Sequence, residues 1–388
     1  MGYFLLATKI LNYKMIYVNK PLLEGNERKY LLNCIKTGWI SSEGPYVKKF
    51  EKEFAKFTNR RFSTSVSNGS VALEIALRSL KLKKGSEVIL PTFTIISCCN
   101  AIINAGLKPV LVDCDLKTWN MNFEEIKKKI SKKTSAIMIV HVYGITVDID
   151  PILAIAKSKK LKIIEDASEM HGQEYKKKKC GSFGDVSIFS FYVNKHITTG
   201  EGGMILTNKK KIYEENLKIK NLYFGKGVNR FKHQGIGWNQ RFTNLQAAIG
   251  LAQLERIKEI VKKKRTIGEY YTKKLKILSN KLHLPLNGTS YCKNIFWIYG
   301  LVIKDSIKVN AEFIINVLKK KGIECRPFFY PMHLQPVYKK MKIFKKTKYP
   351  NSEIISKKGF YIPCGLGINI KDQAKVINTL IKVFKSID

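Results

Sequence analysis

Residues 187–204 read SIFSFYVNKHITTGEGGM, and this stretch decides the fold. The apolar run Val186–Phe191 is typical of a buried strand, and Lys195 follows shortly after it. A glycine-rich turn then leads into Gly203–Thr207, a second apolar run that predicts another strand. Burial at such a strand end lowers the pKa of a lysine and leaves an amine that can attack an aldehyde. Lys195 is therefore a candidate nucleophile.

Further apolar runs on the N-terminal side of this stretch predict a mostly parallel sheet. They alternate with helical patterns and lack the in-and-out alternation of half-exposed strands. Because parallel strands need crossover connections, the predicted fold class is α/β. The strands are expected at 87–90, 109–113, 136–142, 162–165, 186–191 and 203–207. The helices between them are expected at 70–80, 97–105, 122–130 and 150–158.

The C-terminal part of the chain has a different pattern. A long helix is expected from about Thr243 to Glu259, with a basic helical continuation to about Leu278. After it come a strand-like run at 295–303, a helix at 311–320, a proline-rich stretch at 326–336 and a helix after 372. We therefore expect a large α/β domain at 16–265, a small α+β domain at 266–388 and an N-terminal extension at 1–15.

The net charge is +40, from 70 Lys and Arg against 30 Asp and Glu. A charge of this size raises the hypothesis of a nucleic-acid-binding protein. The lysines are scattered in short runs such as Lys127–Lys129 and Lys176–Lys179, and they accompany abundant Ile and Asn, which indicates a coding bias. Nucleic acid is therefore not the expected partner, although a positive field would attract a doubly phosphorylated substrate.

The spacing of the cysteines and the hydropathy of the chain indicate the cellular compartment of the protein. The eight cysteines form no C-x-x-C pair, so neither a disulfide framework nor a zinc site is indicated, and no metal is expected. The longest apolar runs are too short to span a membrane, and Gly2–Ala7 lacks the basic region of a signal peptide. A cytoplasmic location is expected.

Two more candidate groups lie near predicted strand ends. The turn Ser67–Ser70 leads into a helix, where backbone amides suit a phosphate, although a residue such as Asn68 is commonly only a helix cap. Asp166 follows a buried strand, and a protonated pyridine nitrogen would be a suitable partner for it. The alternative for Asp166 is a helix cap, as Asp150 before Pro151 would be. Open parallel sheets bind ligands at their strand ends. The turn Ser67–Ser70, Asp166 and Lys195 together therefore indicate a pyridoxal phosphate (PLP) site.

Six stretches resemble the DegT/DnrJ/EryC1/StrS sugar aminotransferases. They are FSFYVNKHITTGEGG (189–203), WISSEGPYVKKFE (39–51), NGSVALEIAL (68–77), HVYGITVDIDPI (141–152), IEDASEMHG (164–172) and GWNQRFTNLQAAIGLAQLERI (237–257). The resemblance runs from about residue 16 to the C-terminus. It implies a PLP-dependent type I aminotransferase fold and a homodimer with shared active sites.

The resemblance also implies roles for individual residues. Lys195 would be the Schiff-base lysine and would shuttle the proton, Asp166 would pair with the pyridine nitrogen, and Glu169 would lie near the ring oxygen. Gly69, Ser70 and Ser190 would hold the phosphate, and Asn68 would be a further cofactor-binding residue. Asn239 would reach the phosphate from the neighbouring subunit, and Trp39, Arg326 and His333 would line the nucleotide-sugar site.

The chain departs from the family pattern at two positions. Ile95 stands where the family usually stacks an aromatic ring on the cofactor, so weaker stacking is expected. His196 follows Lys195, and a related branch that removes a hydroxyl has histidine in place of the lysine itself. Because Lys195 is retained, transamination is favoured.

The reaction that the resemblance implies is transfer of an amino group from L-glutamate, with release of 2-oxoglutarate, to C4 of a nucleotide-linked 4-keto-6-deoxy sugar. NKHITTGEGGM (194–204) and GIECRPFFYPMHLQPVY (322–338) are similar to the members that make GDP-perosamine, so the expected acceptor is GDP-4-keto-6-deoxy-D-mannose. A UDP- or dTDP-linked sugar, and a PLP protein that does not transaminate (a sugar dehydratase or a regulator), stay open as alternatives.

Overall fold

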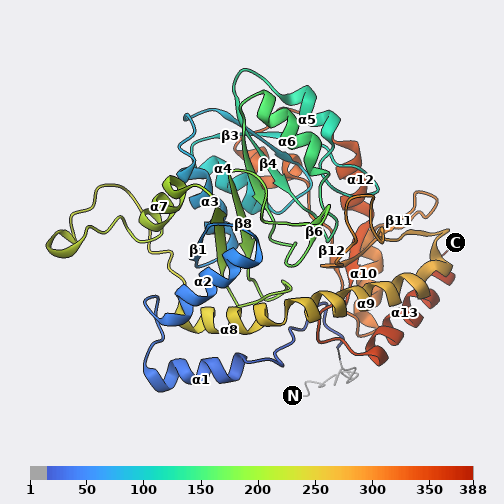
Figure 1. Cartoon of the computed structure of the whole chain (residues 1–388). Coiled ribbons are helices and arrows are strands. Elements are labelled where there is room, and N and C mark those ends of the chain that lie inside the picture. The colour runs from blue at the N-terminus through green and yellow to red at the C-terminus, as the bar shows by residue number, and fades with distance from the viewer. Residues whose placement is uncertain (1–14, 388) are drawn as a thin grey trace, which may run out of the picture.

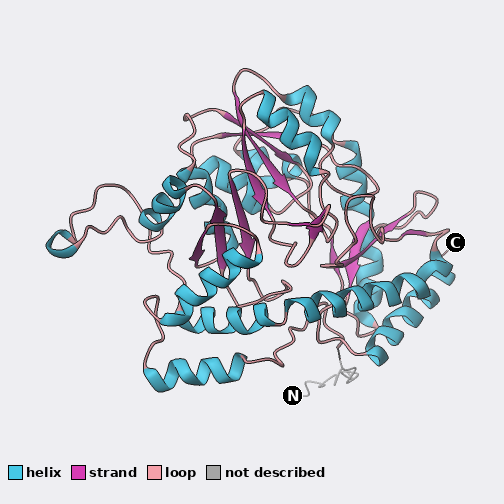
Figure 2. Cartoon of the chain, viewed as in Figure 1, coloured by secondary structure: helices cyan, strands magenta, loops and turns pink. Residues whose placement is uncertain are grey.

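A computed structural model describes residues 15–387, which fold around a seven-stranded sheet (Figure 1). The strand order is β1-β9-β8-β5-β4-β2-β3, and β9 pairs antiparallel with both of its neighbours while the other pairings are parallel. Helices lie on both faces of this sheet (Figure 2), so the predicted α/β fold is confirmed. The strands are β1 (Phe62–Val66), β2 (Glu87–Pro91), β3 (Lys108–Val112), β4 (Thr134–Val140), β5 (Lys162–Asp166), β8 (Val186–Ser190) and β9 (Gly203–Thr207). A short hairpin, β6 (Glu174–Tyr175) and β7 (Lys178–Lys179), precedes β8.

The four helices expected between the strands are present, but the structure differs from the sequence pattern near residue 256. The long helix expected from Thr243 to Glu259 is two helices, because Arg256 leaves helical geometry with φ −104° and its amide closes a tight turn on Gln253 at 3.1 Å. A capping box formed by Thr243 and Gln246 starts the first of them. The helices are α1 (Glu27–Thr37), α2 (Pro45–Phe57), α3 (Gly69–Ser79), α4 (Ile96–Asn104), α5 (Phe123–Lys129), α6 (Ile149–Ser158), α7 (Lys210–Ile219), α8 (Asn244–Glu255) and α9 (Ile257–Leu275). The four helices expected between the strands are α3, α4, α5 and α6, whereas α1, α2 and α7 were not predicted.

Strand β1 is absent from the strands that the sequence predicted. Its residues, Phe62–Val66, include three hydroxyl side chains, which hide the apolar run expected of a buried strand. Two of these hydroxyls are satisfied: Ser65 donates its amide and its hydroxyl to Glu51 Oε1 at 2.8 and 2.7 Å, and Ser63 donates to the Glu51 carbonyl. Within the described residues, the buried Thr64 hydroxyl has no hydrogen-bond partner. Tertiary hydrogen bonds therefore permit a polar strand in the sheet.

A second, antiparallel sheet forms the C-terminal part. Its order is β10-β11-β13-β12, from β10 (Leu282–His283), β11 (Tyr299–Ile303), β12 (Arg326–Pro327) and β13 (Gly359–Ile362). The helices of this part are α10 (Ala311–Lys320), α11 (Pro336–Lys340), α12 (Pro350–Lys358) and α13 (Ile370–Lys385). The domain boundary expected at 265/266 falls inside α9, whose residues contact α13. Ile16, the expected first residue of the large domain, pairs with Ile323 of the C-terminal part. The extension expected at 1–15 lies outside the described residues apart from Met15.

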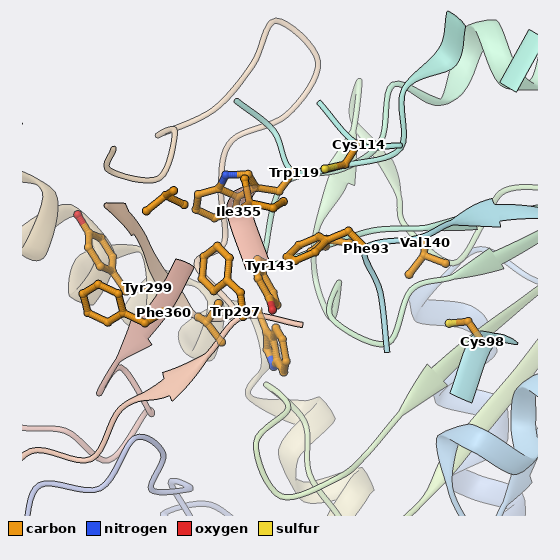
Figure 3. Packing of buried hydrophobic residues seen from close by; sticks show 14 of the residues in the cluster. Phe93, Cys98, Cys114, Trp119, Val140, Tyr143, Trp297, Tyr299, Ile355 and Phe360 are labelled. Atoms are coloured by element: carbon orange, nitrogen blue, oxygen red, sulfur yellow. The ribbon is translucent and has the colours of Figure 1, made fainter. Parts of the chain in front are cut away.

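An aromatic cluster joins the small sheet to the strand ends of the large one (Figure 3). Phe93 follows β2 and Tyr143 follows β4, and their ring centroids lie 6.0 and 4.8 Å from that of Phe328. Trp297, which precedes β11, stacks on Tyr143 at 5.9 Å. The cluster therefore fixes C-terminal residues over the carboxyl edge of the parallel strands, where the sequence predicts the ligand site.

Among residues 15–387, no helix has the length and apolar composition needed to cross a bilayer.

Arg60 stabilises the turn that leads into β8 through hydrogen bonds. Removal of the Arg60 side chain is therefore expected to destabilise the protein. The buried guanidinium donates to the carbonyls of Gly181 (2.8 Å), Gly184 (3.2 Å) and Phe183. Arg60→Ala leaves these carbonyls without their donor and is expected to cost about 3–5 kcal/mol, measured as a fall in thermal and denaturant unfolding midpoints. The adjacent exposed Arg61→Ala is the control. Equal stability of the two variants would contradict this role.

Candidate active site

The N-terminus of α3 forms a cradle beside the end of β8. Asn68 caps the helix by accepting a backbone amide at 3.0 Å. A Cβ on Gly69 would lie 2.7 Å from Ser190 Cβ, so only glycine leaves room for this approach. Ser70 Oγ lies 2.7 Å from Ser97 Oγ. Hydroxyls next to the first amides of a helix are a suitable site for a phosphate.

Asp166 ends β5 and is almost fully buried, at 3% exposure. The Ser168 amide donates to its Oδ1 at 3.0 Å, and the Cys98 thiol donates to its Oδ2 at 3.3 Å. Both donors are neutral, so neither hydrogen bond supplies a positive charge to the buried carboxylate, although the charge of Lys195 acts on it from a distance. Such a charge is costly unless a ligand compensates it.

Lys195 lies in the turn between β8 and β9, with its side chain largely buried. Its Nζ is 3.8 Å from Glu169 Oε1 and 4.0 Å from the centre of the Trp297 ring. The Trp297 indole is held in turn by donating to the Asn194 carbonyl at 3.0 Å. Burial lowers the pKa of Lys195, opposed by the charge of Glu169, which increases the fraction of reactive neutral amine.

Glu169 stands between Lys195 and the loop after β4. Its Oε2 accepts the Tyr143 amide at 2.7 Å, and Tyr143 has a positive φ of 61°, a backbone conformation that aims this amide at the carboxylate. Burial raises the pKa of Glu169 to about 8, with Lys195 acting against the rise. Glu169 can therefore hold or release a proton near neutral pH.

The raised pKa of Glu169 predicts a pH-dependent stability. Because the folded value of about 8 exceeds the ordinary 4.5, the stabilisation is present below pH 4.5 and is lost as the pH rises through 8. Glu169→Gln is expected to flatten this decline, which can reach about 1.4 kcal/mol per pH unit. The measurement is unfolding of the cofactor-free protein between pH 5 and 8, and Glu174→Gln is the control. An unchanged slope in Glu169→Gln would show that the carboxyl titrates normally.

These groups border one cavity of about 660 Å³, a size typical of small-molecule sites. The cavity lies at the carboxyl ends of the parallel strands and beneath residues of the small sheet. The predicted site residues that line it are Asn68, Gly69, Ser70, Ile95, Asp166, Glu169, Ser190, Lys195 and Arg326.

Three predicted site residues lie outside the lining of this cavity. Trp39 is half exposed after α1. Asn239 pairs with Asn221, at the base of a segment that projects from the body after α7 (Figure 1), and accepts from Arg241 at 2.8 Å. The ring nitrogens of His333 contact Thr92 at 2.8 Å and Glu353 at 3.0 Å, so His333 links the loop after β2 to α12.

The buried group His141, Glu165 and Cys180 has the composition of a metal site but the hydrogen bonds of a structural one. His141 Nδ1 accepts the Val147 amide at 3.0 Å, so its Nε2 carries the hydrogen and donates to Glu165 at 3.3 Å. Glu165 also accepts the amides of Gly181 and Phe183. The imidazole lone pair and the carboxylate that a metal would need are therefore engaged within the protein.

Several lining residues gave no signal in the sequence. Trp297, Phe329 and Tyr361 come from the small sheet and its loops, and apolar or aromatic residues there are typical of ordinary core strands. Cys98 also gave no signal, because its contact with Asp166 exists only in the folded chain, where the first turn of α4 reaches the end of β5.

The donor set fits PLP. The cradle at Gly69 leaves space that a Cβ would fill and offers helix amides and hydroxyls to the phosphate. Asp166 offers a buried carboxylate to the ring nitrogen, and Lys195 offers an amine to the aldehyde. All three groups line the same cavity.

Comparison with known proteins gives the family. The model of the DegT/DnrJ/EryC1/StrS aminotransferase family matches residues 21–381. The GDP-perosamine synthase of Vibrio cholerae is 42% identical over 368 residues, which cover 95% of this chain and 98% of that protein. The GDP-perosamine synthase of Escherichia coli O157:H7 is 43% identical, covering 90% of this chain and 93% of that protein.

Solved structures agree with this assignment. An aminotransferase of Helicobacter pylori involved in the biosynthesis of pseudoaminic acid has a TM-score of 0.90 at 22% identity, covering 96% of this chain and 100% of that chain. The GDP-4-keto-6-deoxy-D-mannose-3-dehydratase of E. coli has a TM-score of 0.86 at 25% identity, covering 95% and 100%. The fold is that of the PLP-dependent aminotransferases, and the chain belongs to the DegT/DnrJ/EryC1/StrS aminotransferase family.

Proposed function

We propose that the protein transfers the amino group of L-glutamate to C4 of GDP-4-keto-6-deoxy-D-mannose and thereby makes GDP-perosamine. The observation that carries the proposal is the meeting of an anion cradle, a buried carboxylate and a buried lysine in one cavity. The choice of sugar rests on the relatives that are 42% and 43% identical over nearly the whole chain. We assign the reaction to the cytoplasm, which eight buried free cysteines support.

In this proposal PLP, when bound, supplies an aldehyde that accepts an amino group and a ring that withdraws electrons. Lys195 Nζ takes the proton from Cα of glutamate and later delivers a proton to C4 of the sugar. Glu169 holds a proton 3.8 Å from this amine, and its pKa of about 8 suits that role at neutral pH. Asp166 keeps the ring nitrogen protonated, and Asn68, Gly69, Ser70 and Ser190 hold the phosphate.

Arg326 is the residue that we assign to the diphosphate of the sugar nucleotide. It lines the cavity, and its side chain remains about half exposed beside Glu324. A guanidinium at the mouth of a cavity suits bidentate contacts with phosphate oxygens. The net charge of +40 would assist the approach of this anionic substrate.

The proposal includes a homodimer with shared active sites. Trp39 and Asn239 lie outside the cavity of their own chain, as expected for residues that serve the site of a neighbouring subunit. The projecting segment next to Asn239 carries Phe231 and Ile236 at 76% and 84% exposure, apolar surface that a second copy would cover.

The position of Lys195 favours transamination over dehydration. Lys195 lines the cavity, whereas the next residue, His196, is buried with its Nδ1 3.5 Å from the His171 carbonyl. In the branch that removes a hydroxyl, histidine replaces the lysine. The amine needed for transamination is therefore the group presented to the substrate.

The test is an assay of the purified protein with PLP, L-glutamate and one acceptor at a time, with products identified by mass. GDP-4-keto-6-deoxy-D-mannose is expected to be aminated, and UDP- and dTDP-linked 4-keto sugars much less so. Amination of another nucleotide sugar would replace the proposed acceptor. Loss of a hydroxyl without amination, or no reaction in a protein that binds PLP, would refute the transamination.

Ile95 predicts a loosely held cofactor. It lines the cavity at 43% exposure, where the family usually has an aromatic ring. Ile95→Phe is expected to lower the Kd for PLP by about 2- to 10-fold, because aromatic stacking adds about 0.5–1.5 kcal/mol. Equilibrium dialysis measures this, with Ile354→Phe, outside the cavity lining, as the control. Weaker PLP binding in Ile95→Phe would indicate that the residue does not face the ring.

A further inference from the structure

Cys98 lies in the first turn of α4 and is fully buried. Its sulfur is 3.3 Å from Asp166 Oδ2 and 3.6 Å from Thr94 Oγ1. An ionised carboxylate can only accept, so the thiol is the donor to Asp166, and the Thr94 hydroxyl is then free to donate to the sulfur. Hydrogen bonds therefore run from Thr94 through Cys98 to Asp166.

The thiol keeps its proton in this position. Burial, together with the negative charge of Asp166, raises the pKa of Cys98 well above that of an ordinary cysteine. The contact is thus a stable donor to a charged acceptor, a stronger kind of hydrogen bond than one between neutral groups. Ser168 donates to the other oxygen, so both oxygens of Asp166 have a fixed donor.

We propose that Cys98 is a positioning residue that keeps the proton on the cofactor's ring nitrogen by stabilising Asp166 as an anion. This inference rests on the proposed function, since it takes the ring nitrogen to be the partner of Asp166. Without the thiol, the proton moves from the ring nitrogen to the carboxylate oxygen, leaving a neutral ring and a neutral acid, and no other bond changes. A neutral ring withdraws electrons less well, so Cys98 supports the reaction through Asp166.

The test uses the full-length protein loaded with PLP that carries ¹⁵N in the ring. Cys98→Val removes the donor at similar volume, and Cys98→Ser restores a donor. Cys99→Val is the matched control, because Cys99 is adjacent and buried but neighbours Tyr338. The ¹⁵N shift is expected to report a protonated-to-neutral ratio about tenfold lower in Cys98→Val, with Cys98→Ser and Cys99→Val near wild type.

A second measurement does not depend on the cofactor. In the infrared spectrum of the cofactor-free protein, the S–H band that disappears in Cys98→Ser is expected at lower frequency than the band that disappears in Cys99→Ser. Equal frequencies would overturn the hydrogen bond and with it the inference, even if Cys98→Val failed to fold. An unchanged ¹⁵N shift in loaded Cys98→Val would overturn this inference alone, whereas a protein that binds no PLP would overturn the proposed function as well.

Discussion

Replacing Lys195 with alanine is expected to lower amino transfer by about 10⁴-fold, because in the proposed function one amine both attaches the cofactor and moves the proton. Its Nζ is 3.8 Å from Glu169 Oε1, its side chain is largely buried, and burial lowers its pKa. A solvent amine or water reaching the cavity has neither this placement nor this pKa. The variant is also expected to lose the absorbance of the lysine-bound cofactor while still binding PLP through the phosphate cradle.

The measurement is the rate of glutamate-dependent amination, with cofactor absorbance recorded on the same samples. Lys210→Ala is the control, since that lysine is 77% exposed on α7. A small primary amine in solution is expected to restore part of the activity of Lys195→Ala, because the vacated space lies in the open cavity. Near-normal activity of Lys195→Ala without added amine would assign the chemistry to another residue.

The sequence located Lys195 and Asp166 because strand topology alone brings them together. Strands β5 and β8 pair in parallel, with Asp166 opposite Ile188, so the residues that follow both strands meet at the same edge. Any sheet containing these two neighbouring strands would produce this meeting. The α3 cradle was predicted from its polar turn and the helix that follows, and the structure adds that β1 leads into it and pairs with β9.

The contacts between the two sheets could not be predicted from the sequence. Trp297 approaches Lys195 only because Phe93, Tyr143 and Phe328 pack the small sheet over the strand ends. Such packing depends on the shapes of side chains that are distant in sequence, and the hydrophobic periodicity of the sequence does not predict which of these side chains meet. Strand β1 was not predicted for a related reason. Its polar residue Ser65 hydrogen-bonds to Glu51, which lies on α2, and this contact forms only in the folded chain.

Asp166→Asn is expected to lower the rate by about 10²- to 10⁴-fold, the effect of losing one partner of a buried ion pair worth about 3–5 kcal/mol. Asparagine preserves the shape, and the Ser168 amide can still donate to the remaining carbonyl oxygen. The variant lacks the charge that, in the proposed function, holds the proton on the ring nitrogen. PLP is expected to remain bound, because the cradle at Gly69 is unaffected. Asp150→Asn is the control, since that aspartate is exposed and pairs with Lys176.

The pH dependence separates an electrostatic role of Asp166 from a structural one. Without the carboxylate, the ring nitrogen has a lower pKa and is protonated only at lower pH. The activity of Asp166→Asn relative to wild type is therefore expected to rise as the pH falls, as is the ¹⁵N signal of the protonated ring. A deficit that stays constant across pH would mean that Asp166 only shapes the cavity. A relative activity that recovers on acidification would identify the charge as what the buried carboxylate contributes, and would explain why its protein donors are two neutral groups.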